Sequence, residues 1–184
     1  AITQFECAID AAAFSACVSP KNYTGLADGS HSFKVRGLDS LSVWSSPLTT
    51  SWVIDSVVPN LPVITANIGA VTNTLAASMS FTATDASSGI ASYQCALDAA
   101  AFAACSSPAA LSSLVDGNHS FKVKAIDNAT NESSIASFNF LRDGVLPTVS
   151  ITSTPAASTS STSADFVFAA SDALSGIQKV EFQL

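Results

Sequence analysis

The chain has 184 residues, of which 48% are hydrophobic and only 11% are charged. Acidic residues outnumber basic ones by 14 to 7, and the resulting net charge of −7 argues against nucleic acid or an anionic membrane as a partner. No apolar run approaches the roughly 18 residues that a membrane-spanning helix needs, so we expect no membrane insertion. Low charge with abundant Ser, Thr and Ala suits an extracellular β-protein.

The sequence repeats itself with a fixed offset of 88 positions. Residues 5–14 recur as residues 93–102, and the match continues without a register shift as far as Pro59 and its counterpart Pro147. A unit of this length can form one small hydrophobic core. Catalysis seldom needs two copies of one module in series, so the repeat favours a structural or binding role.

The phase of the repeat predicts one complete domain between two partial ones. A third copy begins at an offset of 87 and runs to the end of the sequence, where Leu184 corresponds to Leu97. We therefore expect residues 1–58 to be the C-terminal part of a domain whose first strands are missing. Residues 59–146 form a complete domain, and residues 147–184 the N-terminal part of a third. This arrangement predicts an internal piece of a longer polypeptide.

Each of the first two copies carries two cysteines ten residues apart, Cys7 with Cys17 and Cys95 with Cys105. An even pair in every module is typical of a disulfide within the module, whereas a zinc site needs four ligands. A hairpin centred on Ala12 places Cys7 and Cys17 directly opposite each other, but a helix separates them by about 15 Å. We predict two hairpin disulfides and an oxidising compartment, extracellular or at the cell surface.

Alternation of apolar and polar residues predicts short strands and no helix in the complete copy. The clearest alternation runs over residues 119–126, with Phe121, Val123 and Ala125 facing inward. Seven strands with turn residues between them indicate an all-β fold, tandem immunoglobulin-like sandwiches of about seven short antiparallel strands. The predicted strands are residues 62–65, 78–84, 90–97, 102–105, 110–114, 119–126 and 135–141.

The pattern C-x-[IL]-D-x3-F-x2-C-x-S-P, followed by L-x-D-G-x-H-x-F-x-V, resembles the bacterial immunoglobulin-like repeats of very large secreted and surface proteins. Its cysteine-containing part matches twice, at residues 7–20 and 95–108. The resemblance implies tandem domains that act as spacers or adhesive stalks. Relatives usually have Gly where Ala11 and Ala99 stand here. In the third copy Phe182 replaces the first cysteine, so that copy lacks the hairpin disulfide.

Residues that could carry chemistry are few, and we expect no enzyme activity and no cofactor. His31 and His119 occupy equivalent strand positions, with no nucleophile or partner carboxylate at a useful spacing. Calcium needs six to eight oxygen ligands, and the end loops offer Asp85, Asp127 and Asn131 as weak candidates. A carboxylate that caps a turn also explains Asp85, so the expectation for metals is none.

Two functions remain open. The leading one is a non-catalytic stalk or spacer segment of a large bacterial surface or secreted fibre or adhesin. Its partners would be neighbouring immunoglobulin-like domains of the same longer chain, with host-cell or matrix ligands bound through other domains. The alternative is a carbohydrate- or protein-binding accessory module of an extracellular protein or enzyme. Such a module should repeat exposed aromatic residues at equivalent positions, yet Trp44 has no aromatic counterpart in the second copy.

Fibre assembly is a further possibility, head to tail or lateral. Residues 148–184 of one chain could supply strands that residues 1–58 of another chain lack. Against this, residues 177–184 duplicate residues 2–9, so the merged domain would carry one strand twice. Completion by further sequence of a longer chain is the preferred expectation.

Overall fold

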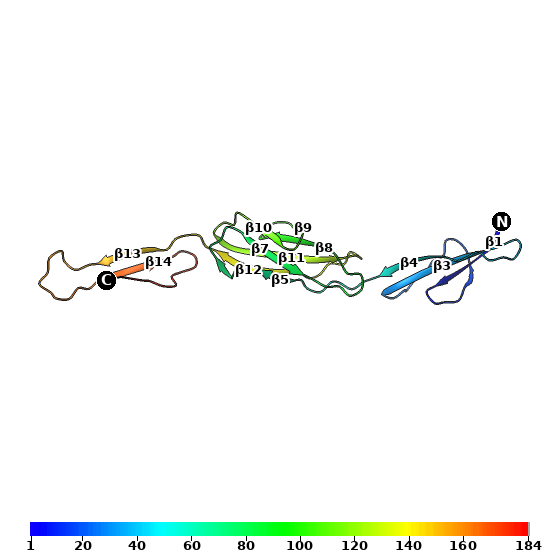
Figure 1. The fold of residues 1–184 in the computed structure, drawn as a ribbon, viewed down its shortest axis with the longest axis horizontal. Coiled ribbons are helices and arrows are strands. Elements are labelled where there is room, and N and C mark those ends of the chain that lie inside the picture. Colours follow the sequence, from blue (N-terminus) through cyan, green and yellow to red (C-terminus); the bar gives the residue numbers. More distant parts are fainter. Residues whose placement is uncertain (184) are drawn as a thin grey trace. The chain divides into compact units, whose positions relative to one another are not determined.

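The computed structural model describes residues 1–183, and this part of the chain is built from strands without helices (Figure 1). It therefore contains no helix long and apolar enough to span a membrane. The predicted all-β fold class is confirmed. Leu184, the expected counterpart of Leu97, lies outside the described residues.

The chain divides into two compact units. The first contains residues Ala1–Leu61 together with the segments Ala83–Ser92 and Ala125–Ser134, and the second contains the remaining described residues. These boundaries cross the middle copy of the repeat, because two of its loops belong to the first unit. The division into domains at residues 1–58, 59–146 and 147–184 stays a prediction.

The first copy forms one antiparallel sheet with the strand order β2-β1-β3-β4. Its centre is the pairing of the long strand β3 with both β1 and β4. The strands are β1 (Ile2–Ile9), β2 (Ser15–Cys17), β3 (Gly29–Asp39) and β4 (Leu48–Ile54).

The middle copy forms a three-stranded sheet of order β10-β7-β5 and a five-stranded sheet of order β6-β12-β11-β8-β9. All seven predicted strands are present, with ends shifted by at most a few residues. The additional strand β6 pairs in parallel with β12, and its two residues were too short a signal to predict. The strands are β5 (Val63–Ala66), β6 (Val71–Thr72), β7 (Ala77–Thr82), β8 (Ile90–Leu97), β9 (Ala103–Cys105), β10 (Ala109–Leu111), β11 (Gly117–Asp127) and β12 (Ala136–Arg142).

The hydrophobic core lies between these two sheets. Phe121 and Val123 of β11 are 1% and 0% exposed, as the alternation of that strand predicts. From the opposite sheet, Phe81 stacks on Phe121 with ring centroids 6.1 Å apart and meets Tyr93 edge-on at 5.0 Å. Burial of these aromatic side chains removes large apolar surfaces from water and stabilises the small domain.

The cysteine hairpins differ from the prediction in their register. Cys7 pairs with Ser15, and Cys17 pairs with Phe5, so the two cysteines are diagonal neighbours and not directly opposite. The turn causes this shift, because the N–H of Ala12 bonds to the carbonyl of Ile9 and moves the hairpin centre by one residue. The structure nevertheless joins Cys7 to Cys17 and Cys95 to Cys105, each with Cα atoms 5.8 Å apart.

The third copy contributes a hairpin of β13 (Thr148–Ser153) and β14 (Val167–Ser171). Its apolar residues are uncovered: Phe168 is 46% exposed, whereas its counterpart Phe81 is 2% exposed. Residues 172–183 form no strand, although residues 177–183 correspond to most of β8. In the middle copy β8 pairs with β9 and contributes Tyr93 and Leu97 to the core, and the third copy has no equivalent sheet among the described residues.

The first and middle copies offer a matched test of where the hydrophobic core lies. We expect Phe121→Ala to lower the free energy of unfolding by about 3–5 kcal/mol, because it removes a fully buried ring. Phe33→Ala, at the equivalent half-buried position, should cost about 1 kcal/mol. Guanidinium unfolding followed by circular dichroism measures both values, and equal losses would contradict this placement of the core.

Candidate functional site

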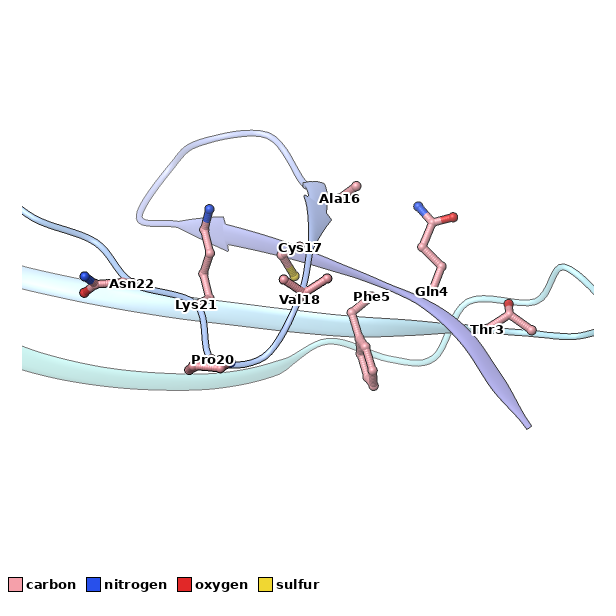
Figure 2. Close-up of a pocket in the computed structure, with 9 residues that line it drawn as sticks. All are labelled: Thr3, Gln4, Phe5, Ala16, Cys17, Val18, Pro20, Lys21 and Asn22. Carbon is pink, nitrogen blue, oxygen red and sulfur yellow. The ribbon is translucent and has the colours of Figure 1, made fainter.

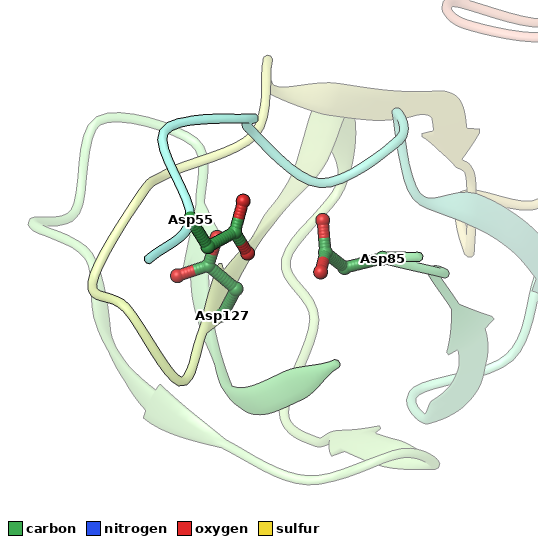
Figure 3. A group of neighbouring side chains, drawn as sticks. All are labelled: Asp55, Asp85 and Asp127. Atoms are coloured by element: carbon green, nitrogen blue, oxygen red, sulfur yellow. The ribbon is translucent and has the colours of Figure 1, made fainter. Parts of the chain in front are cut away.

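Three carboxylates meet within the first unit. Asp55 follows β4, Asp85 lies in the loop after β7, and Asp127 ends β11. Each offers an oxygen, and these atoms all lie within 4.8 Å of one another (Figure 3). Asp127 is 1% exposed and Asp55 9%, while Asp85 is half-buried. Like charges so close together in a poorly solvated place repel one another strongly.

Backbone N–H groups hold two of these carboxylates in position. Oδ1 of Asp85 accepts hydrogen bonds from the N–H groups of Ser87, Ser88 and Gly89 at 2.9 to 3.1 Å. The N–H of Ser88 is the main reason that the pKa of Asp85 lies below its ordinary value, since burial acts in the opposite direction. Oδ1 of Asp127 likewise accepts from the N–H of Ala129 at 2.9 Å. These hydrogen bonds fix the orientation of both carboxylates, and those to Asp85 favour its charged form.

Asn131 connects the loop after β11 to the segment after β4. Its side-chain nitrogen donates to the backbone oxygens of Asp55 and Val57 at 3.1 and 3.3 Å. It also donates to Oδ2 of Asp127 at 2.8 Å. Asn131 thus acts as a donor that positions its neighbours. Of the three calcium candidates named from the sequence, Asp85 and Asp127 come together, and Asp55 joins them.

The residues of the repeat that correspond to this carboxylate group one copy further along the chain are arranged differently. Asp143 and Asp172 correspond to Asp55 and Asp85, and the counterpart of Asp127 would fall beyond residue 184. Oδ2 of Asp143 accepts a hydrogen bond from the N–H of Ser175 at 3.0 Å. Hydrogen bonding by the Ser175 side chain is the main cause that lowers the pKa of Asp143. Here the carboxylate oxygen is satisfied by the protein itself.

Each histidine has a carboxylate partner that the sequence analysis missed. Nδ1 of His119 lies 2.8 Å from Oδ2 of Asp98, and Nδ1 of His31 lies 2.9 Å from Oδ2 of Asp10. The aspartates sit at the hairpin turns with positive φ angles of 56° and 52°, a conformation that Asp tolerates. The expectation of no partner carboxylate was wrong, because the hairpin brings the partner from 21 residues away.

The second ring nitrogen of each histidine is also occupied. Nε2 of His119 lies 2.9 Å from the carbonyl oxygen of Val115, and the ring packs on Phe140 at 5.2 Å between centroids. His31 repeats both contacts, with Ala27 and Trp52. A ring with both nitrogens engaged has none left to take a proton from a substrate, so the geometry assigns these histidines a structural role.

A cavity of about 670 Å³ lies beside the first hairpin, lined among others by Phe5, Cys17 and Lys21 (Figure 2). Lys21 and Asn22 correspond to Ala109 and Ala110 of β10. In the middle copy these residues pair with β7, and the first copy has no equivalent of that strand among its described residues. The cavity therefore lies at the place that β7 occupies in the middle copy.

Trp44 is engaged within the first sheet. The guanidinium of Arg36 lies over the rings of Trp44 and Phe14, 4.4 Å from each centroid. In the middle copy Lys124 lies over Phe102 alone, at 5.4 Å. A cation–π stack inside the protein accounts for this aromatic side chain without a ligand.

The fold and its repeated contacts define an all-β protein with immunoglobulin-like sandwich architecture. No family model matches the chain, and none of the curated proteins compared with it matches either. Among solved structures, the chain is similar to the fibronectin(III)-like modules of Clostridium thermocellum CbhA. The identity is 19%, the match covers 77% of this chain and 78% of that chain, and the TM-score is 0.43. Membership in the bacterial tandem-repeat family stays a prediction.

The His119–Asp98 pair predicts a stability maximum in mildly acidic solution. The carbonyl of Val115 and then Asp98 raise the pKa of His119 above 6.5, so its contribution to stability is complete below that pH. It is lost as the pH rises through the raised pKa. Burial raises the pKa of Asp98, but hydrogen bonds from His119 and Ser120 outweigh it and lower the value below 3.8. That contribution is lost as the pH falls through the lowered pKa.

We therefore expect the melting temperature to be highest between about pH 4 and 6.5 and to fall on either side. Asp98→Asn should flatten the alkaline side, because the asparagine cannot favour the charged imidazole. Melting temperatures over this range, with an NMR titration of His119, check the result. A pKa of His119 at or below 6.5 would contradict the pairing.

Proposed function

We propose that this chain is a non-catalytic spacer segment of a large extracellular protein, such as a bacterial surface or secreted fibre or adhesin. One observation carries the proposal: the polar residues that recur between the two copies are used for internal contacts. Ser45 Oγ accepts from the N–H of Gly37, and Ser133 Oγ accepts from the N–H of Ala125. The Asp–His pairs repeat in the same way. The polar residues that recur are those that stabilise the fold of a module, and not residues that line a pocket.

The covalent cross-links support the same role. Each hairpin disulfide closes a loop between residues separated by ten positions, which stabilises a small domain by about 2–3 kcal/mol. Disulfides are typical of proteins that fold in an oxidising compartment. We place the chain outside the cell or at its surface on this ground. The accessory binding module is less well supported, since Trp44 is already occupied by Arg36.

We further propose that neighbouring immunoglobulin-like repeats of the same longer chain cover the exposed apolar strands. Several apolar positions that are buried in the middle copy are less buried in the others: Phe168 is exposed where Phe81 is buried, and Phe33 is half-buried where Phe121 is buried. A second copy of the chain could supply such strands instead. Sedimentation velocity distinguishes the two sources. A mass that stays that of one chain at every concentration supports completion within a chain, whereas growth with concentration supports head-to-tail assembly.

A spacer that transmits tension should unfold in discrete steps under force. In single-molecule stretching of the 184-residue chain, we expect the middle copy to give one such step. Reduction should lengthen the released chain by about 30 Å, the extended length of ten residues less the 5.8 Å that separates the Cα atoms of Cys95 and Cys105.

A variant with both Cys95→Ser and Cys105→Ser serves as the control, because reduction should not change the length that its middle copy releases. Smooth extension without a discrete step would contradict a role in carrying tension. In the parent chain, a step whose length is the same before and after reduction would contradict the disulfide between Cys95 and Cys105.

A further inference from the structure

Both ring nitrogens of each histidine face groups that can only accept a hydrogen bond. In the middle copy Nδ1 of His119 meets Oδ2 of Asp98, and Nε2 meets the carbonyl oxygen of Val115, at 2.8 and 2.9 Å. An ionised carboxylate and a carbonyl have no proton to donate. A neutral imidazole carries one N–H, whereas the imidazolium carries two. Only the charged form of the ring therefore makes both hydrogen bonds.

Loss of a proton from the ring must break one of these two bonds, and the bond to Val115 is the one that breaks. A hydrogen bond to a carboxylate is roughly twice as strong as one between neutral groups, so the neutral ring keeps its N–H on the side of Asp98. The lone pair of Nε2 then faces those of the carbonyl oxygen. His119 is 7% exposed and packs on Phe140, whereas Val115 is 68% exposed. The loop therefore moves away, and the ring stays in place.

The other charged groups near His119 do not change this outcome. Nζ of Lys122, on the same strand, donates to the backbone carbonyl of Asp98 at 2.9 Å and leaves its carboxylate to the ring. In the loop, Asp116 forms an ion pair with Arg142 at the end of β12. Asp98 is thus the carboxylate that the imidazolium meets directly.

The loop that each histidine holds also holds the segment that follows the last strand of its copy. The aspartate next to the loop carbonyl makes this contact. Oδ1 of Asp116 accepts from the N–H of Gly144 at 2.6 Å. In the first copy, Asp28 accepts from the N–H of Ser56 at 3.2 Å and from its hydroxyl at 2.8 Å. Both segments lead to the next copy of the repeat. A loop that moves takes its aspartate with it and weakens the hold on the segment.

The first copy has the same arrangement without the arginine. His31 lies between the carboxylate of Asp10 and the carbonyl of Ala27, at 2.9 and 2.8 Å. Nζ of Lys34 donates to the carbonyl of Asp10 at 3.3 Å, as its counterpart does in the middle copy. Ile54 stands where the middle copy has the arginine that pairs with the loop aspartate. His31 therefore contributes a larger share of what holds the loop of the first copy.

We propose that each Asp–His pair is a pH-dependent latch that immobilises the segment leading to the next copy. In acid the imidazolium holds the loop carbonyl, and the aspartate of the loop holds the segment. The carbonyls of Ala27 and Val115, and then the paired aspartates, raise the pKa of His31 and His119 above 6.5. As the pH rises through these raised pKa values, the loop and the segment become mobile while the sandwich stays folded.

The test is NMR spectroscopy of the 184-residue chain between about pH 5.5 and 9. The imidazole signals give the midpoints of His31 and His119, and backbone 13C relaxation gives order parameters without relying on exchangeable protons. At Asp28 and Ser56 we expect values of about 0.85 below the midpoint of His31 and under about 0.6 above it. The equivalent residues of the middle copy should show a smaller decrease that follows the midpoint of His119.

Asp10→Asn is the matched variant, and the middle copy is its internal control. Asparagine tolerates the positive φ of 52° at this turn and keeps an acceptor for the N–H of Ser32, but it cannot favour a charged His31. The midpoint of His31 and the loss of order at Ser56 should both move to lower pH, with the middle copy unchanged. Circular dichroism establishes that the variant folds.

Three results would each overturn the proposal. The first is an order parameter of Ser56 that does not change across the midpoint of His31. The second is a transition at Ser56 that stays at its original pH when Asp10→Asn moves the midpoint of His31. The third is a loss of order throughout both copies at one pH, because that is unfolding of the chain and not release of a segment.

Discussion

The carboxylate of Asp98 is the group on which the local geometry of the complete repeat depends. It accepts from the N–H of Ser120 at 2.8 Å and meets His119, which is 7% exposed. One short side chain thus fixes the hairpin turn, the start of the long strand β11 and the orientation of a buried ring. Asp10 makes the same contacts in the first copy, so they belong to the repeating unit and not to its surroundings.

Much of the fold follows from the sequence, because strand alternation is a local property. The inward side of β11 is visible in the spacing of Phe121, Val123 and Ala125. The register of the hairpin is harder to predict from the sequence than the inward side of a strand. Counting to the midpoint between Cys7 and Cys17 ignores the bond from the N–H of Ala12 to the carbonyl of Ile9, which shifts the centre. The strand β6 was missed because two residues carry no periodicity.

The candidate site was only partly predictable for a different reason. Asp85 and Asp127 were visible as loop carboxylates, but the part played by Asp55 depends on tertiary contacts between segments far apart in the chain. The partners of the histidines were hidden in the same way, since Asp98 and His119 are separated by 21 residues. Repetition could have revealed them: Asp10 and His31 recur together at the same offset, which indicates that they act as a pair.

The three-carboxylate group is divided between two copies of the repeat, and this has a consequence for how an array of copies can change in evolution. One aspartate comes from the end of one copy, and the other two come from loops of the next. Every full copy therefore carries both halves of the group, one for each neighbour. Duplication or deletion of whole copies would keep the three aspartate positions of each remaining junction together in the sequence. The length of such a protein can vary through unequal recombination without any compensating substitution.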